Sequence, residues 1–302
     1  GSIGASGVID GRATTALLIG GRDENGAVRA VILEGDGVLN EGAIRAAAFD
    51  GAATALEFGA GADAATLENT GEINARALFG YSDDAISDDT YGEASAVAVH
   101  LAADSAVRRL LNTQGQIIAT VQAGSGEGAS ATAIRVGSDN LEAIHNTGAI
   151  TAGLTGAPPS GLEEQDGAAI IAVDAREHDA GLTILQTQAL DADGEPTETE
   201  PNITGDVLFG DGDDTLDIQA GALNGDIFFG DGVDRLILNG ASLSGAINDS
   251  DGQLTVEVTD GRITLSGQDS LELTEALFNE GGGLQIQIDT DQRNGAFISA
   301  SN

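Results

Sequence analysis

The feature that most constrains the fold is a phrase that returns after 20 residues in the last third of the chain. Ile-Thr-Gly-Asp-Val-Leu-Phe-Gly-Asp-Gly over 203–212 is followed by Leu-Asn-Gly-Asp-Ile-Phe-Phe-Gly-Asp-Gly over 223–232, and a third copy begins at Leu243. Stacking residues 20 apart aligns aliphatic side chains in four columns: Ile203, Leu223 and Leu243; Val207, Ile227 and Ile247; Leu216, Leu236 and Val256; and Ile218, Leu238 and Val258. Parallel strands stacked about 4.8 Å apart produce such columns.

A looser repeat occupies the first two thirds of the chain. Four segments share a hydrophobic residue, a turn of Asn and Gly, and an alternating apolar strand; their asparagines are Asn40, Asn69, Asn112 and Asn146. An Ala-rich strand phrase recurs over 53–58, 96–101, 131–136 and 169–173. We therefore expect two short strands in each unit, and a column of asparagine amides that bond along the stack.

Together these repeats predict an all-β fold, a right-handed single-stranded parallel β-helix (solenoid) with loop insertions. Residues 1–200 are expected to form coils with Asn-Thr-Gly repeats and polar insertions. Residues 201–302 are expected to form regular 20-residue coils and the C-terminal end of the same solenoid. Helical signals are weak, and the best short candidate is 270–278.

Four polar, turn-rich insertions interrupt the repeats, at 80–91, 122–128, 156–166 and 191–201. We predict surface loops there. If they share one corner of the solenoid, they line one edge and form the surface that recognises a cell-surface protein or glycan.

The charge of the chain narrows its partners. Twelve basic residues, all of them Arg, face 49 acidic ones, giving a formal net charge of -37. Nucleic acids and anionic membranes are repelled by such a chain. No apolar stretch approaches the roughly 20 residues of a membrane span. Because the repeat pattern starts and stops abruptly, we expect the chain to be a fragment of a larger protein.

Several motifs resemble one family, the passenger regions of bacterial autotransporters. They are the Asn-Thr-Gly-x-Ile-x-Ala phrases at 69–75 and 146–152, the Gly-Asp-Gly corners at 210–216 and 230–236, and the absence of Cys and Lys. The resemblance implies a non-enzymatic stalk, scaffold or adhesin, secreted or displayed on the bacterial cell surface. It also implies an outer-membrane barrel in the full-length protein. Some relatives carry a protease domain before the helix, so a scaffold that follows a protease is another alternative.

The Gly-Asp-Gly corners also resemble the G-x-G-x-D-x-hydrophobic calcium turn of RTX repeats. The candidate calcium ligands are Asp211, Asp214, Asp231 and Asp234, since calcium prefers carboxylate and carbonyl oxygens. RTX turns recur every nine residues, however, whereas these recur after 20. The residues thus leave two interpretations, bound calcium or simple acidic corners, and no other cofactor is expected.

We predict no enzymatic activity, although a glycan-active β-helix enzyme, a polysaccharide lyase or hydrolase, is the main alternative. No serine lies in a G-x-S-x-G elbow, and the chain has three histidines, His100, His145 and His178. His100 and His145 are interpreted as surface or strand positions, although a triad assembled from distant coils stays open. Paired carboxylates are interpreted as exposed loop charges, at Asp83–Asp84, Asp88–Asp89, Glu163–Glu164 and Asp213–Asp214.

Overall fold

The computed structural model describes residues 1–7, 11–49, 51–78, 94–122, 128–156, 167–265, 270–286 and 297–300. Strands and turns account for these residues, and no helix occurs among them. In that part of the chain, accordingly, no helix is long and apolar enough to cross a membrane.

Three long parallel sheets contain almost all of the strands. Sheet A comprises β1 (Ser2–Ser6), β5 (Ala43–Phe49), β8 (Glu72–Leu78), β11 (Gln116–Gln122), β14 (Ala149–Thr155), β17 (Asn202–Thr204), β20 (Ala222–Asn224), β23 (Ser242–Gly245), β26 (Arg262–Leu265) and β29 (Gly283–Ile286). Sheet B comprises β2 (Thr14–Ile19), β6 (Ala52–Phe58), β9 (Ser95–Leu101), β12 (Ser130–Val136), β15 (Ala169–Asp174), β18 (Asp206–Leu208), β21 (Ile227–Phe229) and β24 (Ile247–Asp249). Sheet C comprises β3 (Val31–Leu33), β4 (Val38–Asn40), β7 (Ala62–Asn69), β10 (Ala106–Asn112), β13 (Ala143–Asn146), β16 (Thr183–Gln186), β19 (Thr215–Ile218), β22 (Arg235–Asn239), β25 (Thr255–Thr259) and β28 (Glu275–Phe278). A separate pair joins β27 (Ser270–Leu273) to β30 (Phe297–Ala300).

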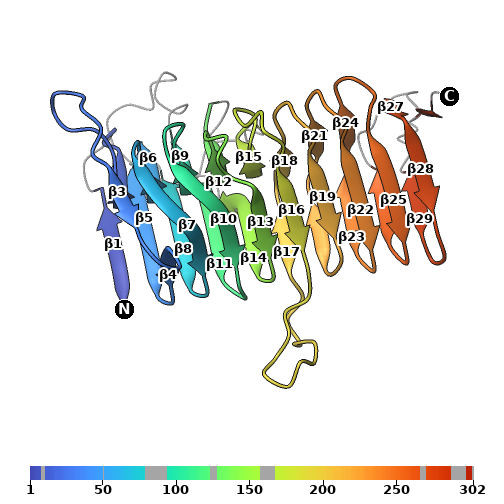
Figure 1. The fold of residues 1–302 in the computed structure, drawn as a ribbon, viewed down its shortest axis with the longest axis horizontal. Coiled ribbons are helices and arrows are strands. Elements are labelled where there is room, and N and C mark those ends of the chain that lie inside the picture. The colour runs from blue at the N-terminus through green and yellow to red at the C-terminus, as the bar shows by residue number, and fades with distance from the viewer. Residues whose placement is uncertain are drawn as a thin grey trace.

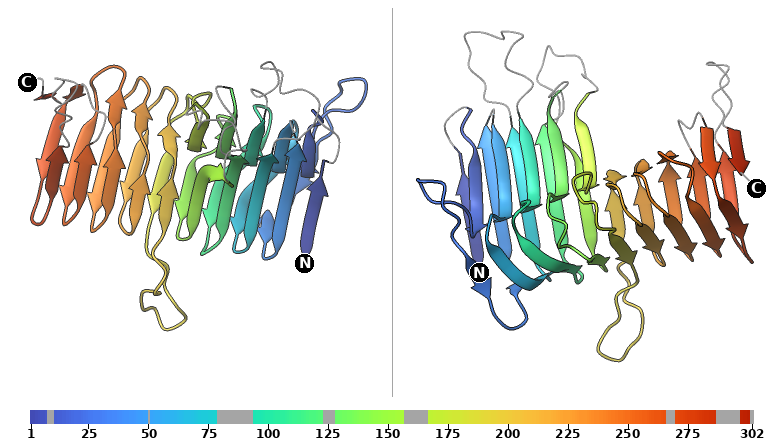
Figure 2. Two further views of the ribbon diagram at one scale, coloured as in Figure 1. Left: turned by 180° about the vertical axis from the view of Figure 1, so that it is seen from behind. Right: turned by 45° about the horizontal axis from the view of Figure 1, so that its top comes forward.

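The chain visits sheets A, B and C in turn and then returns to sheet A one coil further along. Figure 1 shows the coils side by side along one long axis, with β1 and β29 at opposite ends, and Figure 2 shows the same stack from two further sides. The parallel β-helix predicted from the repeats is confirmed. In the looser coils the chain contributes strands to all three sheets, rather than the two strands predicted for each unit, because the residues that end in each Asn of the repeat form the additional strand, in sheet C.

The predicted aliphatic columns form the interior. Val207 pairs with Ile227 and Ile227 with Ile247, and the other three columns stack in the same way. All of these side chains are at most 2% exposed. The column of sheet A continues into the looser coils through further isoleucines, namely Ile44, Ile73, Ile117 and Ile150.

The prediction of a short helix at 270–278 is wrong. This segment contains two strands, β27 and β28, and β28 pairs in parallel with β25. A few residues with helical preference gain little from an isolated turn, whereas strand pairing supplies backbone hydrogen bonds along the stack.

The asparagine column is confirmed, and it extends one coil further than predicted. The amide nitrogen of each side chain donates to the amide oxygen of the next, at 2.7 Å from Asn40 to Asn69 and 2.8 Å from Asn69 to Asn112 and from Asn112 to Asn146. Asn146 then donates to Gln186 Oε1 at 2.8 Å. The four residues from Asn69 to Gln186 are fully buried. Each asparagine amide thus bonds to the neighbouring coil as well as to the glycine of its own turn, which fixes the register of the coils.

Glycine beside the asparagine column allows the turns to stack closely. A Cβ on Gly71 would collide with the carbonyl oxygen of Gly42, and one on Gly148 would collide with that of Gly115. The turn after Asn112 has one extra residue, Gln114, which takes a φ of +56°. This left-handed conformation absorbs the extra residue, so both Asn112 and Gly115 keep their places in the columns.

The insertions do not all share one corner. Nearly all of 80–91, 122–128 and 156–166 lie outside the described residues, but the flanking strands place all three between sheet A and sheet B. The fourth, 191–201, lies between β16 of sheet C and β17 of sheet A, so the prediction of a common corner is wrong for it. Figure 1 shows this segment projecting from the rod as an arm.

The projecting arm is a hairpin that the repeats did not indicate. Leu190 pairs with Pro196 in antiparallel fashion, and Asp191 Oδ1 accepts the amides of Asp193 and Glu195 at 2.9 and 3.0 Å. A matching hairpin, with an Arg22–Val28 bridge, lies between sheet B and sheet C. In it, Asp23 Oδ1 accepts the amides of residues 25 and 27 at the same two distances.

Asn112→Ala tests the amide column. We expect it to lower the free energy of unfolding by about 2–4 kcal/mol, because it removes from a buried amide column both the bond that Asn69 donates and the bond that Asn146 accepts. Asn224→Ala, at an exposed position of sheet A, is the control and should cost under about 0.5 kcal/mol. Equal losses in the two variants, measured by chemical denaturation, would contradict this role.

Candidate functional site

A row of charged side chains crosses the outer face of sheet B. Glu57 on β6 pairs with His100 on β9, His100 pairs with Arg135 on β12, and Arg135 pairs with Asp174 on β15. Each of the first three lies between two buried apolar residues of its strand. Strand alternation therefore turns these polar side chains outward, and the parallel register brings them together from four coils.

Asp174 is the best-fixed carboxylate of the row. Arg176 Nε lies 2.8 Å from Asp174 Oδ1, and Arg176 Nη2 lies 3.0 Å from Oδ2, while Asp174 is only 8% exposed. Burial alone would raise the pKa of Asp174, but the hydrogen bonds and charge of Arg176, together with the charge of Arg135, hold it below its ordinary value. Asp174 is therefore ionised at neutral pH.

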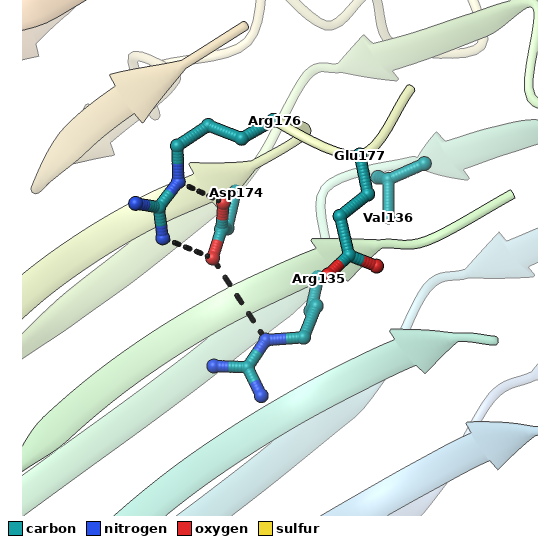
Figure 3. A pocket seen from close by; sticks show the side chains of 5 residues that line it. All are labelled: Arg135, Val136, Asp174, Arg176 and Glu177. Carbon is teal, nitrogen blue, oxygen red and sulfur yellow. Dashed lines mark hydrogen bonds and ion pairs between the residues drawn. The ribbon is translucent and has the colours of Figure 1, made fainter. Parts of the chain in front are cut away.

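An open pocket of about 440 Å³ lies beside this pair. Its described lining consists of Arg135, Val136, Asp174, Arg176 and Glu177 (Figure 3). Because Arg176 occupies both oxygens of Asp174, Arg135 approaches them only to 3.9 Å, beyond hydrogen-bonding distance. The pocket thus contains one guanidinium that lies beside a fixed carboxylate and makes no hydrogen bond to the described residues.

His100 contributes no fixed positive charge at neutral pH. Burial lowers its pKa, and the charge of Arg135 lowers it further, while Glu57, with Oε1 at 3.8 Å from His100 Nδ1, acts in the opposite direction. Acid–base catalysis by two carboxylates normally needs one with a raised pKa. Asp174 has a lowered one and is paired with arginine, so this arrangement favours binding over catalysis.

The four candidate calcium ligands separate into two stacked pairs. Asp211 and Asp231 are exposed, whereas Asp214 is 1% and Asp234 0% exposed. Asp214 Oδ1 accepts the amide of Leu182 at 2.6 Å, and Asp234 Oδ1 accepts the amide of Asp214 at 2.8 Å. The inner pair therefore joins successive coils.

The second oxygen, Oδ2, of Asp214 and of Asp234 is buried and has no hydrogen-bond partner. Burial raises the pKa of Asp214 to about 7 and that of Asp234 to about 6, and neighbouring carboxylates add to both shifts. Within the described ranges, no group of three or more His, Cys, Asp or Glu side chains is placed to hold a metal ion. Calcium binding at these corners stays a prediction.

The other residues singled out from sequence have mixed outcomes. His100 and His145 do lie on strands, and His145 Nε2 is 2.8 Å from Thr187 Oγ1. His178 is buried in a turn, with Nε2 2.7 Å from the carbonyl oxygen of Leu141. No histidine of the described chain is hydrogen-bonded to a serine, as a catalytic triad would require.

Among the paired carboxylates, Asp213 is exposed as expected, but the same expectation for Asp214 is wrong. The remaining paired carboxylates, at 83–84, 88–89 and 163–164, lie outside the described residues.

Sequence reasoning missed the charged pocket, although part of its signal was present. Aligning the Ala-rich strand phrases on Ala55, Ala98, Ala133 and Ala172 places Glu57, His100, Arg135 and Asp174 at one position. The role of Arg176 depends on how the turn after β15 folds back over the strand, which the alignment does not contain.

Arg176→Gln tests the pair with Asp174. We expect a loss of about 1 kcal/mol in the free energy of unfolding at pH 7, at the low end for a charged hydrogen bond because Arg176 is largely exposed. Since the folded-state pKa of Asp174 is lowered, this contribution is present above the ordinary aspartate pKa and is lost as the pH falls through the lowered value. The difference from the parent chain should therefore shrink in acid. A difference that is constant with pH, or an equal loss in the exposed control Arg235→Gln, would contradict the assignment.

Melting with calcium and with chelator tests the acidic corners. The calcium hypothesis expects a higher melting temperature in calcium, and expects Asp214→Asn together with Asp234→Asn to abolish the difference. Asp63→Asn, on a distant coil, is the matched control and should leave the difference unchanged. Equal melting temperatures with and without calcium would favour simple acidic corners.

Comparison with known proteins adds no family to this picture. A scan against protein-family models found no match, and searches of curated proteins and of solved structures found none either. The functional argument therefore depends on the geometry of the chain itself.

Proposed function

We propose that this chain is the non-enzymatic passenger segment of a secreted or surface-displayed bacterial protein of the autotransporter type, acting as a stalk or scaffold that presents an adhesive surface. The observation that carries the proposal is the unbroken stack of coils, with sheet A running from β1 to β29. A solenoid of this kind extends along one axis and holds whatever lies on its sides at a distance from its base.

The order of contacts supports export as an unfolded chain. Each main strand pairs only with strands of the coil before and the coil after it. Coils of this kind are able to fold one after another as the chain emerges, since none waits for a distant segment. This behaviour suits passage through an outer-membrane barrel, the partner that we propose in the full-length protein.

Recognition is best assigned to the outer face of sheet B. The three insertions between sheets A and B each lead into one of the strands β9, β12 and β15, which also carry His100, Arg135 and Asp174. The charged pocket lies at the other end of these strands, at the turns that follow β12 and β15. We propose that a cell-surface protein or glycan binds at the pocket on this face, whereas the net charge of -37 disfavours nucleic acid.

Binding and degradation assays on the purified chain test this function. We expect binding to a glycan or a surface protein on arrays, and a loss of about tenfold or more with Arg135→Gln, as for removal of a charged hydrogen-bond donor. Arg235→Gln, an exposed arginine without an ion pair among the described residues, should bind like the parent chain. Acidic and neutral polysaccharides should show no new reducing ends and no unsaturated products.

Three outcomes would contradict the proposal in different ways. Polysaccharide cleavage would replace it with the glycan-active enzyme. A lack of any ligand, with normal surface display, would leave a stalk without adhesive function. A gene whose downstream region encodes no membrane barrel would contradict the autotransporter route of export.

A further inference from the structure

The charged pocket contains one guanidinium for which the described residues supply no hydrogen-bond acceptor. Arg176 occupies both oxygens of Asp174, and the side chain of Arg135, 39% exposed, makes only the 3.9 Å contact of Nε with Oδ2. A guanidinium carries five N–H donors, and partial burial removes some of the water that would satisfy them. Figure 3 shows the two terminal nitrogens of Arg135 turned away from Asp174.

Arg135 is well placed to receive a planar anion. Its backbone belongs to β12, which is paired on both sides, with β9 and with β15. Asp174, itself fixed by Arg176, attracts the guanidinium from one side. A carboxylate is able to bind the free edge of such a guanidinium through two parallel hydrogen bonds.

The rest of the lining indicates what the carboxylate is attached to. Glu177 is exposed, and its carboxylate makes no hydrogen bond within the described part of the chain, so it is free to accept from hydroxyl groups. Val136 is the one apolar residue of the described lining, and no aromatic side chain is among them. The volume, about 440 Å³, lies within the range of small-molecule sites.

We propose that this pocket binds a sugar acid with a single carboxylate, which pairs with Arg135 while its hydroxyl groups donate to Glu177. The proposal rests on the assignment of recognition to sheet B and names the ligand class. The net charge of -37 repels a polyanion but costs a singly charged ligand far less. A peptide carboxylate would also pair with Arg135, but its side chains would find little apolar surface beside Val136.

Ligand-observed NMR titration of the whole chain tests the proposal with three probes: methyl glucuronide, methyl glucoside and acetyl-glycyl-glycine. We expect the glucuronide to bind at least about tenfold more tightly than the neutral glucoside. Arg135→Gln should weaken glucuronide binding by about tenfold or more, and Glu177→Gln by a few-fold. Arg135→Lys should fall between, because it keeps the charge but loses the two parallel hydrogen bonds. Arg235→Gln is the matched control and should have no effect.

Equal binding of glucuronide and glucoside, or parent-like binding by Arg135→Gln, would overturn the proposal. Tighter binding of acetyl-glycyl-glycine than of glucuronide would reassign the pocket to a peptide end and also overturn it. If Arg135→Gln fails to fold, as judged by its melting curve, Arg135→Lys and Glu177→Gln decide the result by the same criterion. Failure with the glucuronide, combined with Arg135-dependent binding on arrays, would reject the ligand class and leave the proposed function standing.

Discussion

Backbone hydrogen bonding between parallel strands of successive coils is the constraint on which the rest of this molecule depends. Such pairing places residue over residue, so each position of a coil meets its own counterpart above and below. An aliphatic side chain then packs on another aliphatic side chain, and an amide bonds to an amide, as Asn69 does to Asn112 at 2.8 Å. The same rule is unfavourable for charge, because a buried carboxylate meets another carboxylate. Asp214 and Asp234 illustrate this: one oxygen of each accepts a backbone amide of the preceding coil, and the other has no partner.

The interior was largely predictable from sequence because it repeats a local pattern at a fixed interval. Val207, Ile227 and Ile247 are 20 residues apart and form one buried column. Where the interval drifts, the asparagines still aligned the coils, since a buried amide has few alternative partners. The sheet C strands of the looser coils were not predicted, because strands such as β13 are only four residues long and end in the same Asn that the sequence assigns to a turn. Local helical preference gave the wrong prediction for 270–278, because the pairing of β28 with β25 outweighs a short helical signal.

The candidate site was less predictable, for a physical reason. Its members come from different coils, and Arg135 and Asp174 meet only because β12 and β15 are neighbours in sheet B. Aligned strand sequences are enough to place each of these residues in the charged row. They do not show that Arg176 hydrogen-bonds both oxygens of Asp174, because that depends on the path of a single turn. Burial of Asp214 was hidden in the same way: its neighbour Asp213 has the same chemistry, and alternation along the chain puts one outside and the other inside.

A solenoid separates the residues that hold it together from those that meet other molecules. Inward positions of sheet B are restricted to side chains that fit the columns, whereas outward positions contribute little to the packing. The row Glu57, His100, Arg135 and Asp174 changes charge from coil to coil while the inward residues stay apolar. Recognition residues are thus able to change without loss of the fold, provided that like charges are not stacked without an intervening partner. Arg135, between His100 and Asp174, meets that condition. Because the second arginine, Arg176, hydrogen-bonds both oxygens of Asp174, the guanidinium N–H donors of Arg135 are left for a ligand.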